Sequence, residues 1–264
     1  MIFLKLGGSA ITDKTRQATP REEAIRRIAV QVKRARELQP ELDLLIGHGS
    51  GSFGHFAAKE FGFGERDNWR AYAETGAAAA RLNRLVTDIF LDQGIPMVSL
   101  QPSASARCRD GVLVDLAVEP IRTALAHKLV PVLFGDVAVD ESRGMSIAST
   151  EILFAYLAPR LNPIRIILAG IVEGVFMNDP LKDFVQSTQL IREITPQSFP
   201  QIESQLRGSH GVDVTGGMMT KVRTMLDVVE RSPNIRVHIV SALREGVIER
   251  ALAGDENDGT LIHA

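Results

Sequence analysis

Three short glycine-rich stretches combine small residues with basic side chains. Residues 5–9 read Lys-Leu-Gly-Gly-Ser, residues 48–55 read His-Gly-Ser-Gly-Ser-Phe-Gly-His, and residues 213–221 read Asp-Val-Thr-Gly-Gly-Met-Met-Thr-Lys. Glycine lets backbone N–H groups approach an anion closely, and lysine or histidine adds a positive charge or a hydrogen-bond donor. These stretches therefore predict a site for one or more phosphate groups.

The third stretch enters a predicted helix, with Thr215 as the expected N-cap and Gly216 and Gly217 directly after it. Free N–H groups and the positive end of the helix dipole attract an anion at such a position. Lys221 follows Gly217 by four residues, so its side chain lies on the same helix face and leans toward the N-terminus. A phosphate would meet amides and an ammonium group together, although an ordinary capped helix with a solvated lysine would have the same residues.

Lys5 lies within an apolar run that reads as a buried strand. An unpaired lysine is costly to bury, so Lys5 needs either an anionic partner or access to a cleft. Gly7 and Gly8 follow it and would let a phosphate approach the backbone. Lys14, a few residues later, has the sequence context of a surface lysine apart from its nearness to this loop.

Residues 49–54 also match the dinucleotide fingerprint Gly-x-Gly-x-x-Gly, but their context differs from it. The fingerprint requires an acidic residue at the end of a second strand roughly 20 residues on. Residues 67–74 read instead as the start of a helix, and the stretch follows the second predicted strand of the chain. The Walker pattern is absent. The loop is therefore interpreted as a phosphate-binding loop and not as an NAD site.

The two histidines of this loop have different expected roles. His48 ends the strand and is expected to be a structural, hydrogen-bonded residue. His55 follows four small residues at the start of an expected helix, where it could donate a hydrogen bond to a phosphate. No third ligand stands at a recognisable spacing, so a metal site is not predicted.

Apolar strand-length runs alternate with amphipathic helix-length segments from end to end. The strand candidates are 2–6, 42–47, 96–100, 130–134, 164–169 and 236–240. Helices are expected over about 69–93, 150–161, 198–206, 217–230 and 246–253, with turns at 110–111 and 141–144. The strands mostly lack alternation, which is typical of a parallel sheet covered on both faces. We therefore expect a single α/β domain over 1–264, a three-layer αβα sandwich with a mostly parallel open sheet.

The first helix is predicted between the first two strands. Thr19 is its expected N-cap, Pro20 suits its first turn and Glu22 completes a Thr-x-x-Glu capping box. An apolar stripe at helical spacing follows, formed by Ile25, Ile28, Ala29, Val32 and Ala35.

Composition excludes several classes of protein. The chain has 264 residues, a formal net charge of −2 and 23% charged residues, which gives no electrostatic case for a nucleic-acid partner. No apolar run reaches the ~18–20 residues of a membrane span, and residues 1–4 are too short for a signal-peptide core. The single cysteine, Cys108, excludes an intrachain disulfide and suits a reducing cytoplasm. A cytoplasmic protein without a membrane or nucleic-acid partner is expected.

Together these residues resemble the isopentenyl phosphate kinases of the amino acid kinase superfamily. Residues 5–9 followed by Ile11-Thr12-Asp13-Lys14 match the family's first loop, 48–55 its second loop, and 213–221 its late Thr-Gly-Gly-Met…Lys element. The segments 134–136, 144–147 and 174–180 fall in the family's order. The Ser-Phe-Gly-His ending distinguishes these kinases from other members. The resemblance spans the whole chain and implies ATP-dependent phosphorylation of isopentenyl phosphate to isopentenyl diphosphate, for isoprenoid biosynthesis.

The resemblance also implies roles for individual residues. Four basic residues would serve catalysis, namely Lys5, Lys14, His55 and Lys221. The implied ATP-binding residues are Lys5, Gly7, Gly8, Ser9, Ser50, Gly170, Gly174, Asp179, Gly217 and Lys221. The implied acceptor-binding residues are Gly49, Ser50, Gly51, His55, Gly135, Asp136 and Glu151. Residues from 1 to about 160 would form an acceptor-binding lobe and those from about 161 to 264 a nucleotide-binding lobe. Mg²⁺ would accompany ATP without a ligand set predicted from the protein, and the chain would form a homodimer.

Three residues depart from the family pattern. Ser50 replaces the middle glycine of the second loop, where a positive φ would be unfavourable for serine. Glu151 stands where the family often has aspartate, so its carboxylate would orient the lysines from one methylene further out. Ile171 stands where an acidic residue is common in the nucleotide loop.

Other functions remain compatible with these residues. A kinase of the same fold could act on another small phosphate, on a phosphonate such as fosfomycin, or on a carboxylate or carbamate. A non-catalytic nucleotide-sensing protein is a further alternative, and an NAD-dependent oxidoreductase comes last. The helix over 69–93 could form one wall of an apolar slot through its alanines at 73, 77 and 80 and the segment 82–89, or the alanine run could simply serve close helix packing.

Overall fold

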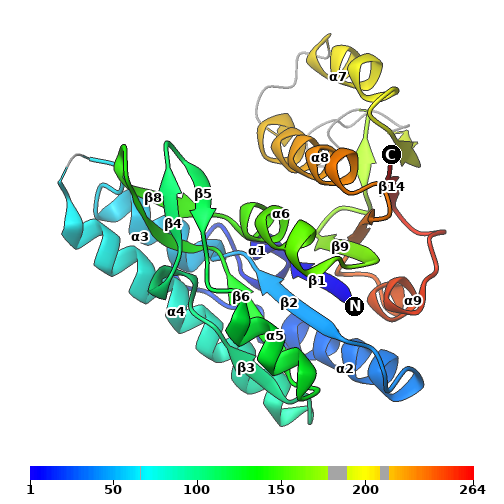
Figure 1. Ribbon diagram of the computed structural model, residues 1–264, viewed down its shortest axis with the longest axis horizontal. Helices are drawn as coiled ribbons and strands as arrows, with labels where there is room; N and C mark the ends of the chain where they lie inside the picture. Colours follow the sequence, from blue (N-terminus) through cyan, green and yellow to red (C-terminus); the bar gives the residue numbers. More distant parts are fainter. Residues whose placement is uncertain (66, 178–188, 209–213) are drawn as a thin grey trace.

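The computed structural model describes residues 1–65, 67–177, 189–208 and 214–264, and it describes no side chains for 205–208 and 214–216. Its main sheet has eight strands in the order β12-β14-β13-β9-β1-β2-β6-β3 (Figure 1). These strands are β1 (Ile2–Leu6), β2 (Leu44–His48), β3 (Met97–Ser99), β6 (Val130–Phe134), β9 (Arg165–Gly170), β12 (Glu193–Ile194), β13 (Arg236–Ser241) and β14 (Thr260–Ile262). All six strand candidates from the sequence belong to this sheet, and β1 and β6 have the predicted bounds.

The central strands pair in parallel, and only β14 runs antiparallel to its neighbour β13. β1 is buried along its whole length, as expected for a strand covered on both faces. Because β1, β2, β6, β9 and β13 run in the same direction, the loops that follow them meet at one edge of the sheet.

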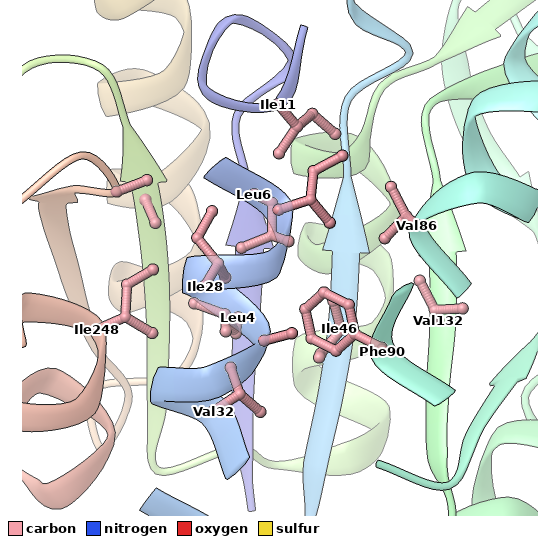
Figure 2. Packing of buried hydrophobic residues seen from close by; sticks show 14 of the residues in the cluster. Leu4, Leu6, Ile11, Ile28, Val32, Ile46, Val86, Phe90, Val132 and Ile248 are labelled. Carbon is pink, nitrogen blue, oxygen red and sulfur yellow. The ribbon is translucent and has the colours of Figure 1, made fainter. Parts of the chain in front are cut away.

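The sheet is covered by helices on both faces. The helices of the chain are α1 (Gly8–Ile11), α2 (Glu22–Leu38), α3 (Gly51–Glu60), α4 (Trp69–Asp92), α5 (Glu119–Ala126), α6 (Thr150–Leu161), α7 (Phe199–Gly208), α8 (Val214–Arg231) and α9 (Val247–Ala253). Side chains of α2, α4 and α9 pack on one face of the sheet in one hydrophobic cluster, in which α2 and α4 cover β1, β2 and β6 and α9 covers β9 and β13. Figure 2 shows Ile28, Phe90 and Ile248 in this cluster. A second cluster joins α5, α6 and α8 to the opposite face. The predicted three-layer α/β sandwich is confirmed.

The long α4 and the helix α6 have nearly the predicted bounds. Asn162 ends α6 with φ of 50°, and Gly94 follows α4 with φ of 80°. No helix within the described parts of the chain is both long and apolar enough to cross a membrane.

The predicted cap of α2 is wrong. The helix begins at Glu22, its N-cap position is Arg21, and no side chain caps it. The Thr19 hydroxyl donates instead to the carbonyl of Gln17, at 2.9 Å, and Pro20 pairs with Thr12 in an isolated β-bridge. The apolar stripe of α2 is nevertheless buried as predicted.

A second sheet was not predicted as a sheet. Its strands are β4 (Arg107–Arg109), β5 (Val112–Asp115), β7 (Asp136–Asp140) and β8 (Gly144–Ala148), in the order β5-β4-β7-β8. The predicted turns at 110–111 and 141–144 lie between its antiparallel pairs. Two further short strands, β10 (Val175–Phe176) and β11 (Leu190–Ile191), form a separate ladder.

Candidate functional site

A cleft with a volume of about 430 Å³ lies at the edge of the main sheet where the parallel strands end. It is lined by Lys5, Gly7, Gly8, Ser9, Lys14, Gly49, Ser50, Gly51, His55, Gly135, Ile147, Ser149, Thr150, Glu151, Gly170, Ile171, Val172, Gly217, Met218 and Lys221. Residues from all three glycine-rich stretches therefore meet in one cavity. The first and second stretches converge because they follow the neighbouring strands β1 and β2, and the loop after β9, the neighbour of β1 on its other side, joins them. The third stretch reaches the cleft from the start of α8.

The first two glycine-rich loops are in direct contact. A Cβ added at Gly8 would lie 2.8 Å from both the Cα and the nitrogen of Gly51, and one at Gly49 would lie 3.0 Å from the nitrogen of Gly8. Real Cβ atoms do not approach backbone this closely, so the contact requires glycine. Gly170 and Gly217 are different, because no atom lies within 4 Å of an added Cβ there. These two glycines leave open space in the cleft.

Ser50 does not need the positive φ that would be unfavourable for serine. The φ and ψ of Ser50 are −70° and −9°, an ordinary right-handed conformation that serine adopts without strain. The positive φ, 51°, falls on Gly51. Gly51 also begins α3, so His55 lies in the second turn of that helix and not at its start.

Lys5 has both an anionic partner and access to the cleft. Its ammonium group forms an ion pair with the Glu151 carboxylate, and both residues are buried. Burial lowers the pKa of Lys5, the Glu151 charge opposes that shift, and the charge of Lys221 adds to it. For Glu151, burial alone would raise the pKa, but the charges of Lys5 and Lys221 together lower it. Glu151 thus holds a negative charge beneath a cluster of positive groups.

Lys14 and His55 lie at the exposed part of the cleft. Partial desolvation lowers the pKa of Lys14, and the charge of Lys221 lowers it further. Partial desolvation also lowers the pKa of His55, with the charge of Lys14 acting in the same direction. The positive charges of Lys14 and Lys221 are therefore close enough to repel each other, and an anion bound beside them would relieve that repulsion.

His48 has the predicted structural role. It is fully buried, and its Nε2 hydrogen-bonds with Oδ1 of Asn83 at 3.1 Å. Its ring also stacks on Phe134, with 5.6 Å between ring centroids. Burial lowers its pKa, so the ring stays neutral at pH 7.

Two predicted site residues do not line the cleft. The Asp136 carboxylate turns into the protein and accepts hydrogen bonds from the backbone N–H groups of Ser103, at 3.1 Å, and Val137, at 2.8 Å. An added Cβ at Gly174 would meet Thr260 and Leu190, so this glycine serves packing. Asp179 lies outside the described residues. α8 begins at Val214, so Thr215 lies inside the helix and is not its N-cap.

Five residues of the cleft were not named as site residues from the sequence. They are Ile147, Ser149, Thr150, Val172 and Met218. Ile147 and Met218 belong to the segments 144–147 and 213–221 that carry the family resemblance, and Val172 lies between Gly170 and Gly174, which the resemblance assigns to ATP. Thr150 is the first residue of a helix whose bounds were predicted. Its hydroxyl donates to the carbonyl of His48 at 2.7 Å and ties α6 to the second loop.

The apolar slot predicted along α4 is not part of this cleft, because no residue of that helix lines it. Ala73 and Ala77 are exposed, whereas Ala71, Ala78 and Ala79 are buried in helix packing. Within the described residues, no group of three or more His, Cys, Asp or Glu side chains could hold a metal ion. The cleft therefore offers amides and cations, which suit anionic ligands.

Comparisons with known proteins show which family the chain is similar to. The model of the amino acid kinase family matches residues 1–241. The chain is 39% identical to the isopentenyl phosphate kinase of Methanothermobacter thermautotrophicus, over 99% of this chain and 98% of that protein. It is 31% identical to the one of Methanocaldococcus jannaschii, also over 99% and 98%. A solved structure titled as isopentenyl phosphate kinase has a TM-score of 0.83, 34% identity and 99% coverage of both chains.

Proposed function

Because this chain belongs to the amino acid kinase family, we propose that its cleft transfers the γ-phosphate of ATP to isopentenyl phosphate, giving ADP and isopentenyl diphosphate. The observation that carries the proposal is the meeting of three glycine-rich loops and four basic residues in one cleft. The full-length similarity to isopentenyl phosphate kinases supports this acceptor over the other small phosphates, phosphonates, carboxylates and carbamates.

The proposed reaction needs no general base. The second pKa of a phosphate monoester is about 6, so the acceptor is mostly a dianion at pH 7 and already nucleophilic. The obstacle is the repulsion between two polyanions as an acceptor oxygen approaches the γ-phosphorus. Positioning and electrostatic stabilisation must therefore supply the catalysis. A cleft lined by lysines and backbone amides, in which the carboxylate of Glu151 is paired to Lys5, suits that task.

On the donor side, we assign the ATP phosphates to the first loop and the start of α8. Lys5 and Lys221 would face the phosphates, with the amides of Gly7, Gly8 and Ser9 as further donors. The open space at Gly170 and Gly217 supports placing the rest of the nucleotide between them. The apolar residues Ile171, Val172 and Met218 line that part of the cleft.

On the acceptor side, we assign the phosphate of isopentenyl phosphate to the second loop. Gly49, Ser50 and Gly51 would supply backbone contacts, and His55 would donate a hydrogen bond through its neutral ring. Lys14 would neutralise charge between the two substrates. Ile147 is an exposed apolar residue on the same cleft and offers a surface for the hydrocarbon tail.

Magnesium would be carried by ATP. Mg²⁺ is commonly held by substrate phosphates with few protein ligands, which fits a cleft whose only described carboxylate is Glu151. We derive no step from the ion. The division into an acceptor lobe up to about residue 160 and a nucleotide lobe after it is proposed from the family resemblance, with the first loop of the acceptor lobe contributing to the ATP phosphates. We also propose, from the family resemblance alone, that the protein is a homodimer and acts in the cytoplasm.

A panel of acceptors in an ADP-release assay tests the function. We expect ADP release with isopentenyl phosphate to exceed that with fosfomycin, carbamate, acetate and simple alkyl phosphates. Equal or faster release with another acceptor would reassign the substrate. Saturable ATP binding without ADP release on any acceptor would instead indicate a nucleotide-sensing protein.

A further inference from the structure

Thr12 lies directly behind the contact between the first and second loops. It follows the short helix α1, and its side chain is completely buried. Its hydroxyl donates to the carbonyl of Gly8 at 2.7 Å and accepts from the backbone N–H of Ser52 at 2.9 Å. One hydroxyl group thus hydrogen-bonds to both loops at once.

The bond to Ser52 satisfies a backbone group that would otherwise have no partner. Ser52 is in the first turn of α3, where backbone N–H groups have no acceptor within the helix. The N-cap residue, Ser50, makes no side-chain capping bond to this helix. Thr12 therefore caps α3 from a different segment of the chain. Ser52 is itself fully buried, so water cannot replace this acceptor.

Packing fixes Thr12 against the second loop as well. A Cβ at Gly51 would overlap both the hydroxyl and the methyl group of Thr12, and would lie 3.0 Å from the carbonyl oxygen of Gly8. The two loops and Thr12 are consequently a close-packed unit in which a shift of the hydroxyl group moves both loops relative to each other.

We propose that Thr12 is a positioning residue, which sets the distance between the loop assigned to the ATP phosphates and the loop assigned to the acceptor phosphate. This inference rests on the proposed function for the identity of the two phosphates. Thr12 does not line the cleft, so it acts through Gly8 and Ser52 and not by touching a substrate. Transfer between two bound polyanions depends steeply on their separation, whereas binding of either one alone does not.

Replacing Thr12 with valine tests the hydroxyl group while keeping the shape of the side chain. We expect kcat to fall by ~10–100-fold, since misplacement by about 1 Å costs ~10²-fold in such reactions. The KM values for ATP and for isopentenyl phosphate should stay near those of the wild type, because each loop keeps its own contacts. Thr12→Ser retains the hydroxyl group and should restore most of kcat.

Thr87→Val is the matched control. Thr87 is equally buried, and its hydroxyl donates to the carbonyl of Asn83 within α4, away from the cleft. The Tm of this variant should be lower than that of the wild type, whereas its kcat should be unchanged. A loss of kcat in Thr87→Val equal to that in Thr12→Val would show a general effect of removing a buried hydroxyl, and would overturn the proposal.

A second measurement separates this proposal from the proposed function. Hydrogen exchange of the Ser52 amide, followed by NMR, should accelerate in Thr12→Val and stay slow in Thr12→Ser. Unchanged exchange in Thr12→Val, unchanged kcat, or failure of serine to restore kcat would each contradict the role of Thr12. If the wild type does not phosphorylate isopentenyl phosphate, the proposed function fails, while exchange at Ser52 still decides whether Thr12 holds the two loops together.

Discussion

Replacing Glu151 with glutamine removes the negative charge that balances Lys5. The two side chains form a buried ion pair at the base of the cleft. Removing one partner of a buried pair costs about 3–5 kcal/mol, because the other charge is left uncompensated. The cleft admits water, so we expect a loss near the lower limit, about 3 kcal/mol of unfolding free energy. For a chain of this size that corresponds to a fall in Tm of ~6–12 °C.

The pH dependence of this variant follows from Lys5. Burial already lowers its pKa in the wild type, and loss of the Glu151 charge, which opposes that shift, should lower it further. Between this lowered value and the ordinary value of 10.5, the unfolded chain binds a proton that the folded chain does not. The unfolding free energy of the variant should therefore rise with pH in that window, and its Tm deficit should shrink.

Turnover should move in the opposite direction. As pH rises, Lys5 loses the proton that makes it a cation, and with it the charge that stabilises the phosphates. We therefore expect kcat of Glu151→Gln to fall with rising pH at values where the wild type is still fully active. Saturating ATP should reduce the Tm deficit, since its phosphates supply the missing negative charge.

Thermal unfolding and steady-state kinetics between pH 6 and 9 measure both trends. Glu37→Gln is a matched control, because Glu37 pairs with Lys33 on the surface of α2, at 3.9 Å and with both side chains about half exposed. Such an exposed pair contributes less than about 1 kcal/mol to the unfolding free energy, so Glu37→Gln should change neither Tm nor the pH profile of kcat appreciably. A Tm deficit that does not change with pH, together with a wild-type pH profile of kcat, would refute the account of Lys5.

Three further substitutions test other parts of the account. His55→Ala should raise KM for isopentenyl phosphate sharply and leave KM for ATP nearly unchanged in steady-state kinetics; an unchanged acceptor KM contradicts the role of His55. Lys221→Ala should lower kcat, and wild-type turnover would remove Lys221 from the donor site. Asp140→Asn should destabilise the fold by about 2–3 kcal/mol in chemical unfolding, since the carboxylate accepts four backbone N–H bonds and one from the Ser146 hydroxyl. These bonds hold the pKa of Asp140 far below its usual range although burial opposes them, so the stabilisation should persist down to acid pH.

The main sheet could be predicted because its physical signals are local. β1 and β6 are short apolar runs buried on both faces, and their bounds matched the prediction. The end of α6 was marked by Asn162, which adopts the left-handed conformation there. The second sheet had weaker signals, because some apolar residues of its strands, such as Val112 and Val139, are exposed.

The glycine-rich loops of the site could also be predicted, because close backbone contact leaves glycine in the sequence. The side chains that join the loops from elsewhere could not. The resemblance implied an acceptor-binding role for both Gly135 and Asp136, but only Gly135 lines the cleft, whereas the carboxylate of Asp136 turns into the protein. Thr12 lies within the first-loop motif, but its hydrogen bond to Ser52 could not be predicted, because it joins residues 40 positions apart and depends on tertiary packing.

The most direct test of the account is a crystal structure with a non-hydrolysable ATP analogue and isopentenyl phosphate bound together. The account predicts the γ-phosphate between Lys5 and Lys221, with the acceptor phosphate on the second loop within hydrogen-bonding distance of His55. A terminal acceptor oxygen should lie in line with the bond that breaks. An acceptor phosphate bound outside the second loop, or a nucleotide bound away from the first loop and α8, would contradict it.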